Sequence, residues 1–318
     1  MMTLIQAKGS FIQWPQSHIH GPDKNHQEEK ALPKKSKPQK TSPLIPPANT
    51  FLGIKVSREF KQKQRTMDLK LLETEARVLK ASGTMINVEI DEHILHNKQT
   101  CSLSYEELVH LLDEAEIGAS HITLFMRYLS DVTETMRSTS SYGFLCPHTL
   151  SPYSTVENEN SRSDYIASAM TCTGCGRGRK LIFAPYVEGE HWMLGAINPA
   201  ESIVYWCDPA GYEEPRQFFV DTITKAFNKR NSIDLLAGYE AKEVVWKKIK
   251  CPMQPFGTVL CGYYICRYML EIIRGRYVSI IPNFMLKAPK SYTLEQIDEV
   301  RDIWANFALQ FKPKISDD

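Results

Sequence analysis

The feature that most constrains this fold is a pair of apolar segments joined by a short connection. Residues 191–198 and 203–208 are rich in Trp, Tyr, Val, Ile and Leu, as β-strands usually are. Residues 198–201, Asn-Pro-Ala-Glu, leave room only for a tight turn, so the pair predicts an antiparallel hairpin. The start of its first strand then faces the end of its second. His191 and Asp208 are therefore predicted to be neighbours across the hairpin.

The rest of the chain alternates between helical and strand-like patterns. Residues 261–275 are strongly apolar, which predicts a buried helix. Ser104 followed by Glu107 is a capping-box pattern that opens another helix, and Gly118 is expected to end it. Further helices are predicted at 67–82, 119–137, 161–172, 215–230 and 293–311, and strands at 85–95, 181–189 and 243–254. Together these elements predict an α+β fold, with a central mixed sheet packed on the helix that begins at residue 261.

The N-terminal part differs from the rest in composition. Residues 15–50 are rich in Pro, Lys, Gln and His, and cannot bury enough apolar surface to offset the entropy lost on ordering. We predict a solvated segment over 1–65 and one domain over 66–318, with a helical part at about 66–140 and a core at about 141–311. Lysines between the prolines of the segment leave open a nuclear-import signal.

The charge balance bears on the possible partners. The chain has 38 basic and 37 acidic residues and a net charge of +1, which gives no electrostatic reason to expect nucleic acid as a main partner. No run of about 18 apolar residues is present, so no membrane span is expected. The N-terminus lacks the pattern of a signal peptide, so we expect an intracellular, reducing location, in the nucleus or the cytoplasm. The eight cysteines are then expected to be free thiols.

Three polar residues stand where they could form a nucleophilic site. A thiol nucleophile needs a nearby base that takes its proton and a third group that orients the base. Cys261 begins the buried helix, where the positive end of the helix dipole favours a thiolate. His191 and Asp208 can supply the base and its orienting carboxylate if the hairpin forms. The sequence therefore predicts a cysteine-based site assembled from distant segments.

Gln254 is a fourth candidate, seven positions before Cys261 on the loop that leads to the helix. Its side-chain amide could donate a hydrogen bond to an oxyanion formed near the thiol. A loop glutamine and a buried cysteine are each common without any such role. The prediction therefore depends on all four residues converging.

The same residues lie in blocks that resemble a known family. HWMLGAI, VYWCDPAG and CPMQPFGTVLCGYY are similar to blocks of the ubiquitin-like-protein-specific proteases, cysteine proteases whose better-known members act on SUMO. The similarity covers roughly residues 100–311 and is closest to a divergent plant branch that accompanies transposon-encoded proteins. The resemblance implies a papain-like cysteine peptidase fold with a circularly permuted triad order of His, Asp, Gln and Cys.

The resemblance also implies a role for each residue. Cys261 matches the nucleophile, His191 the base, Asp208 the acid that orients it, and Gln254 the oxyanion donor. Trp192 matches the tryptophan that covers the Gly-Gly end of the substrate. The implied partner is a ubiquitin-like modifier or its conjugate, and the implied reaction is hydrolysis of the bond after Gly-Gly through a thioester. No metal or cofactor is implied, and the oligomeric state is left open.

Two other functions stay open. Leu260 stands where many members of the family have Asp, which favours a binding module that keeps the fold without turnover. A peptidase for a different modifier or an ordinary polypeptide is the second alternative. Cys172 and Cys175 form a lone CxxC pair, and because zinc usually needs a second ligand pair, no metal site is predicted.

Overall fold

The computed structural model describes residues 65–154, 159–171, 181–211, 214–236, 241–278 and 288–311, within one compact unit that begins at Arg65. The helices are α1 (Met67–Ser82), α2 (Glu92–Leu95), α3 (Tyr105–Leu112), α4 (Ala119–Thr135), α5 (Pro147–Leu150), α6 (Glu159–Thr171), α7 (Gln217–Leu236), α8 (Cys261–Arg274), α10 (Leu294–Ala308) and the 3-10 helix η3 (Leu309–Phe311). The strands are β1 (Ile86–Ile90), β2 (Gln99–Leu103), β3 (Tyr142–Phe144), β4 (Leu181–Glu188), β5 (His191–Asn198), β6 (Ile203–Cys207) and β7 (Val245–Lys248). Within these ranges, no helix combines the length and the hydropathy that a bilayer span requires. The proposed domain boundaries stay a prediction.

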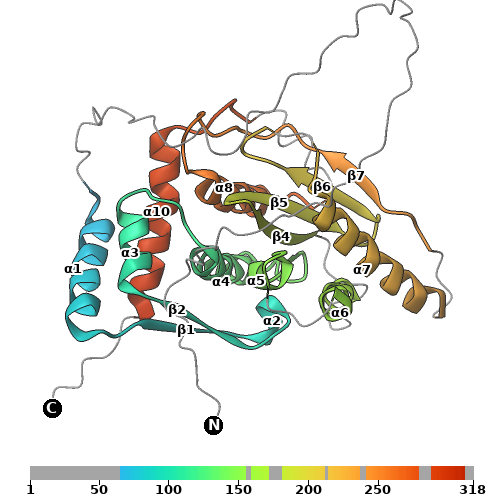
Figure 1. Cartoon of the computed structure of the whole chain (residues 1–318), viewed down its shortest axis with the longest axis horizontal. Coiled ribbons are helices and arrows are strands. Elements are labelled where there is room, and N and C mark those ends of the chain that lie inside the picture. Colours follow the sequence, from blue (N-terminus) through green and yellow to red (C-terminus); the bar gives the residue numbers. More distant parts are fainter. Residues whose placement is uncertain are drawn as a thin grey trace, which may run out of the picture. The chain divides into compact units, whose positions relative to one another are not determined.

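The described strands form two sheets. β1 and β2 make an antiparallel pair near α1 and α3 (Figure 1). The larger sheet has the order β3-β4-β5-β6-β7. It is antiparallel at its centre and parallel at the β3–β4 and β6–β7 pairs. The predicted central mixed sheet is therefore confirmed.

The predicted hairpin is confirmed, with an offset at its open end. β5 and β6 pair antiparallel from Leu194–Cys207 to Asn198–Ile203. The ladder stops before His191, and in the same register Asp208 would lie opposite Met193 rather than His191. The two side chains therefore meet diagonally, beyond the last paired position.

The central strand β5 is buried on both faces because helices cover both sides of the sheet. Trp192, Leu194 and Ala196 belong to a large core that also contains α4, α8 and α10. Met193 and Ile197 belong to a second core, with α6 and α7. Burial on both faces explains why this strand is continuously apolar in sequence rather than alternating.

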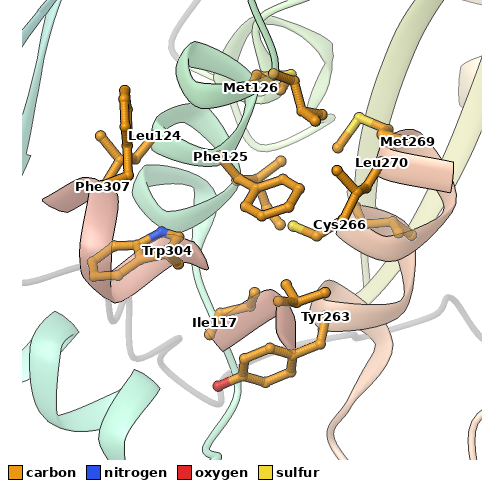
Figure 2. Packing of buried hydrophobic residues seen from close by; sticks show 14 of the residues in the cluster. Ile117, Leu124, Phe125, Met126, Tyr263, Cys266, Met269, Leu270, Trp304 and Phe307 are labelled. Atoms are coloured by element: carbon orange, nitrogen blue, oxygen red, sulfur yellow. The ribbon is translucent and has the colours of Figure 1, made fainter. Parts of the chain in front are cut away.

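Helix α8 lies at the centre of the larger core. Figure 2 shows Phe125 of α4 facing Cys266 and Leu270 of α8. Trp304 of α10 packs on His121 of α4, with 5.2 Å between the ring centroids. Burying an aromatic or leucine side chain contributes about 1.5–3 kcal/mol, so this packing of three helices fixes α8 against the sheet.

The prediction that Gly118 ends the helix opened at Ser104 is wrong. The capping box of Ser104 and Glu107 is present, but α3 ends at Leu112 and Gly118 is the N-cap of α4. The Gly118 N–H donates to Nδ1 of His121 at 3.2 Å, and Nε2 of the same ring donates to the carbonyl of Glu107 at 2.8 Å. The fully buried His121 thus caps α4 and ties it to α3.

The contact between β5 and α7 gives a test of the packing. A Cβ on Gly195 would lie 2.5 Å from Cζ and 2.9 Å from Cε1 of Phe219. We expect Gly195→Ala to lower the free energy of unfolding by about 1–3 kcal/mol, because the ring must move within a filled core. Urea denaturation measures this loss.

The matched control for this test is Phe219→Leu, alone and combined with Gly195→Ala. The double variant should lose less stability than the sum of the single variants, because the smaller side chain makes room for the new methyl group. Additive losses would show that the ring of Phe219 does not cause the effect.

Candidate active site

His191 and Asp208 form a hydrogen bond at the open end of the hairpin. Nε2 of His191 lies 2.6 Å from Oδ1 of Asp208, and the two side chains are 15% and 2% exposed. The N–H of Ala210 donates to the same Oδ1 at 2.8 Å. The turn that follows β6 therefore fixes the carboxylate, and the carboxylate fixes the orientation of the imidazole.

Cys261 is the first residue of α8 and is almost completely buried. Its side chain hydrogen-bonds with the ring of His191, 70 residues earlier in the chain. Leu260 is the N-cap and makes no side-chain hydrogen bond to the first turn of the helix. No capping side chain therefore offsets the positive end of the helix dipole, which acts on the nucleophile candidate.

The environment of His191 favours its charged form. Burial alone would lower the pKa of His191, but hydrogen bonds to Asp208 and Cys261 raise it from 6.5 to about 9. The imidazole is therefore protonated at neutral pH in the folded protein. A protonated imidazole at this position can act as a proton donor.

Trp192, the neighbour of His191, is buried between the sheet and α8. Its Nε1–H donates to the carbonyl of Ile117 at 2.8 Å. A Cβ on Gly262 would lie 2.4 Å from Cγ1 of Ile117 and 3.3 Å from Cδ1 of Trp192. The residue after Cys261 is therefore a glycine because Ile117 and the indole occupy the space of a side chain.

Residues 113–118 contact the candidate site, and no sequence pattern predicted that contact. Arg301 of α10 anchors its start, because the guanidinium donates to the last two carbonyls of α3 at 3.0 and 2.9 Å. Ile117 then supplies the carbonyl that Trp192 binds. The contact joins positions 75 residues apart in the sequence, so it depends on how α3, α4 and α10 pack.

Glu116 is a charged group beside the site that sequence analysis missed. Burial and the negative charge of Glu190 raise the pKa of Glu116, and the nearby charge of His191 lowers it. The imidazole of His191 therefore interacts electrostatically with Glu116 as well as with Asp208, to which it is hydrogen-bonded.

Gln254 lies in the loop that joins β7 to α8. The backbone N–H of Gln254 donates to the carbonyl of Pro209 at 2.8 Å, and this bond places Gln254 beside the turn that follows Asp208. Its side-chain Nε2 donates to the carbonyl of Thr258 at 3.1 Å, within the same loop. An amide nitrogen carries two N–H donors, so one remains for an oxyanion near Cys261. The oxyanion role of Gln254 stays a prediction.

The other described cysteines are buried core residues. A hydrogen bond with Cys251, together with burial, raises the pKa of Cys207, and burial raises the pKa of Cys266 well above its usual range. Cys172 and Cys175 lie outside the described residues. In the part of the chain that the structure describes, no group of three or more His, Cys, Asp or Glu side chains could hold a metal ion.

Comparison with known proteins gives matches among solved structures alone. No family model and no curated protein sequence matches the chain. SUMO protease Ulp1, with its catalytic cysteine oxidised to a sulfenic acid, is 17% identical with a TM-score of 0.50, over 76% of this chain and 94% of that chain. The fold is that of SUMO protease Ulp1.

Two further structures are similar to the chain at slightly lower TM-scores. The C-terminal Ulp1 protease domain in complex with Smt3, the yeast orthologue of SUMO, is 15% identical with a TM-score of 0.49, over 76% of this chain and 94% of that chain. The Ulp1-like SUMO protease catalytic domain of Chaetomium thermophilum is 13% identical with a TM-score of 0.48, over 76% and 89%.

The pKa of His191 gives a direct test of the pair. In a histidine NMR titration, the midpoint of His191 is expected at about 9, and in Asp208→Asn it should fall because the negative charge and its hydrogen bond are lost. The raised pKa also stabilises the fold: this contribution is complete below pH 6.5 and is lost as the pH rises through about 9.

Glu201→Gln is the matched control for this titration, because it removes one negative charge at the turn between β5 and β6, the other end of the hairpin. It should leave the midpoint of His191 unchanged. Equal midpoints in wild type and Asp208→Asn would contradict the electrostatic role of Asp208.

Proposed function

We propose that the protein is a cysteine peptidase that hydrolyses the peptide or isopeptide bond after the C-terminal Gly-Gly of a ubiquitin-like modifier, most closely a SUMO-like one. The observation that carries this proposal is the convergence of Cys261, His191 and Asp208 at the N-terminal end of a buried helix. The fold likeness to SUMO protease Ulp1 supports the same class of reaction.

In the proposed reaction the Cys261 thiolate attacks the carbonyl carbon of the last glycine. The protonated His191 gives its proton to the leaving amine, the carbon–nitrogen bond breaks, and a thioester remains on the enzyme. His191 then takes a proton from water, and the water oxygen attacks the thioester carbon. The carbon–sulfur bond breaks, which releases the modifier with its C-terminal glycine as a carboxylic acid and restores the Cys261 thiolate beside the protonated His191. Asp208 holds the imidazole in place through both steps.

Gln254 and a backbone N–H at the start of α8 are assigned to the oxyanion of each tetrahedral intermediate. Trp192 is assigned to the wall beside the Gly-Gly tail. Its position against Gly262, next to the nucleophile, supports that assignment, because a flat indole leaves room for glycines and excludes larger side chains. The chemistry requires no metal or cofactor.

A binding module without turnover is the second candidate. It is favoured by the burial of Cys261 and Trp192, which are 3% and 2% exposed, and by Leu260 before the nucleophile. A third candidate is a cysteine peptidase that uses the same reaction on a different modifier or on an ordinary polypeptide. The plant transposon-associated branch and the intracellular location stay predictions.

A modifier that carries an electrophile at its C-terminus tests the nucleophile. We expect a SUMO vinyl sulfone to form a covalent adduct with the wild-type protein, visible as a mass shift, and to form none with Cys261→Ala. The thiolate is the group that adds to the electrophile, so its loss should abolish the adduct.

Cys266→Ala is the matched control, since it removes a buried thiol from the same helix. It should be labelled as the wild type is. Absence of an adduct on the wild-type protein, together with retained binding of unmodified SUMO, would favour the binding module. A parallel panel with other ubiquitin-like modifiers identifies the preferred one.

The oxyanion role of Gln254 can be separated from a role in holding its loop. We expect Gln254→Ala to lower kcat for amide hydrolysis by about 10²–10³, as the loss of an oxyanion donor usually does. Alkylation of Cys261 by iodoacetamide passes through no oxyanion, so its rate should stay close to wild type. A parallel loss of both rates would show that the loop has moved.

A further inference from the structure

The loop before the nucleophile exposes three large apolar side chains. Phe256 is 90% exposed, Val259 48% and Met253 46%. Single exposed apolar residues need no explanation, but these three lie within seven consecutive residues that end two positions before Cys261. We call residues 253–259 the apolar loop.

Hydrogen bonds hold the tip of the apolar loop in one shape. The Thr258 N–H donates to the carbonyl of Pro255 at 3.2 Å, and Gly257 between them has φ 76°, as the third residue of a type II turn requires. The side chain of Gln254 closes the turn by donating to Thr258. The hydrogen-bonded turn thus keeps the side chain of Phe256 exposed to solvent.

The apolar loop packs beside the turn that follows Asp208. The Met253 N–H donates to the carbonyl of Lys290 at 2.8 Å, and a Cβ on Gly211 would lie 2.7 Å from Sδ of Met253. Met253 therefore covers the turn that follows Asp208. A Cβ on Gly262, the residue after Cys261, would instead meet Ile117 and Trp192, so the loop before Cys261 and the residue after it contact different segments.

We propose that the apolar loop binds the polypeptide on the amine side of the scissile bond, the segment that bears the modified lysine. The proposal rests on the proposed function, which assigns the Gly-Gly tail to the flank of Trp192 and leaves the flank of the loop to the leaving chain. The apolar loop adjoins the candidate active site, because the backbone N–H of Gln254 in the loop donates a hydrogen bond to Pro209, the residue after Asp208.

Charge around the apolar loop indicates the chemistry of this segment. Lys250 and Lys290 are both exposed. Lys250 precedes the loop in sequence, and the carbonyl of Lys290 accepts the hydrogen bond from Met253. A fitting segment therefore carries an apolar side chain, which covers Phe256, and an acidic side chain close to the modified lysine.

Two substrates with the same modifier separate the two sides of the bond. One is SUMO with a coumarin amide at its C-terminal glycine, and the other is SUMO joined to the lysine of a peptide that carries Leu and Glu beside that lysine. We expect Phe256→Ala to lower kcat/KM about tenfold for the peptide conjugate, a loss of about 1.4 kcal/mol, and to leave the coumarin substrate within about twofold.

The matched control is Leu71→Ala, since Leu71 of α1 is as exposed as Met253, at 46%, and lies outside the site. It should change neither rate. Equal loss of both rates in Phe256→Ala would overturn the proposal, because the loop would then contact the modifier or support the site. Unchanged cleavage of the conjugate would overturn it as well.

A binding measurement keeps this test separate from the proposed function. The fluorescein-labelled peptide alone, followed by anisotropy, should bind the wild-type protein and bind Phe256→Ala about tenfold more weakly. If the wild-type protein cleaves neither substrate, the proposed peptidase fails, and the anisotropy still decides the surface. Equal binding to both proteins would then reject the apolar loop as the docking surface.

Discussion

The packing of the first turn of α8 against β5 is the constraint on which the rest of this structure depends. Cys261 meets His191 because Gly262 has no side chain, which lets Ile117 and the indole of Trp192 close on the helix. A methyl group at that position would push these groups apart. The larger core, with α4 and α10 packed on α8, holds the helix in that position.

Electrostatics then determine what this packing can do. A histidine buried without partners would be neutral, whereas His191 has a pKa of about 9 because it hydrogen-bonds with Asp208 and Cys261. Asp208 in turn depends on the N–H of Ala210 in the turn after β6. The charge needed for nucleophilic chemistry is thus prepared by backbone geometry at the end of one hairpin.

The loop between β7 and α8 connects the two halves of the site. Its Gln254 N–H donates a hydrogen bond to the carbonyl of Pro209, the residue after Asp208, and the loop ends where α8 begins at Cys261. Hydrogen bonds from Thr258 to Pro255 and from Gln254 to Thr258 also hold the exposed tip of this loop, which carries Phe256. Recognition of the leaving chain and stabilisation of the oxyanion would then share one structural element.

The sequence alone determined the elements and the main candidates. Apolar runs with a short connection predicted the hairpin, a strongly apolar segment predicted α8, and residue chemistry brought Cys261, His191 and Asp208 together. Only the tertiary structure decided the diagonal offset of the pair, the role of Gly118 as a cap of α4, and the contact of Ile117 with Trp192. Local patterns encode strands and helices, whereas these contacts join residues that become neighbours only when the helices pack on the sheet.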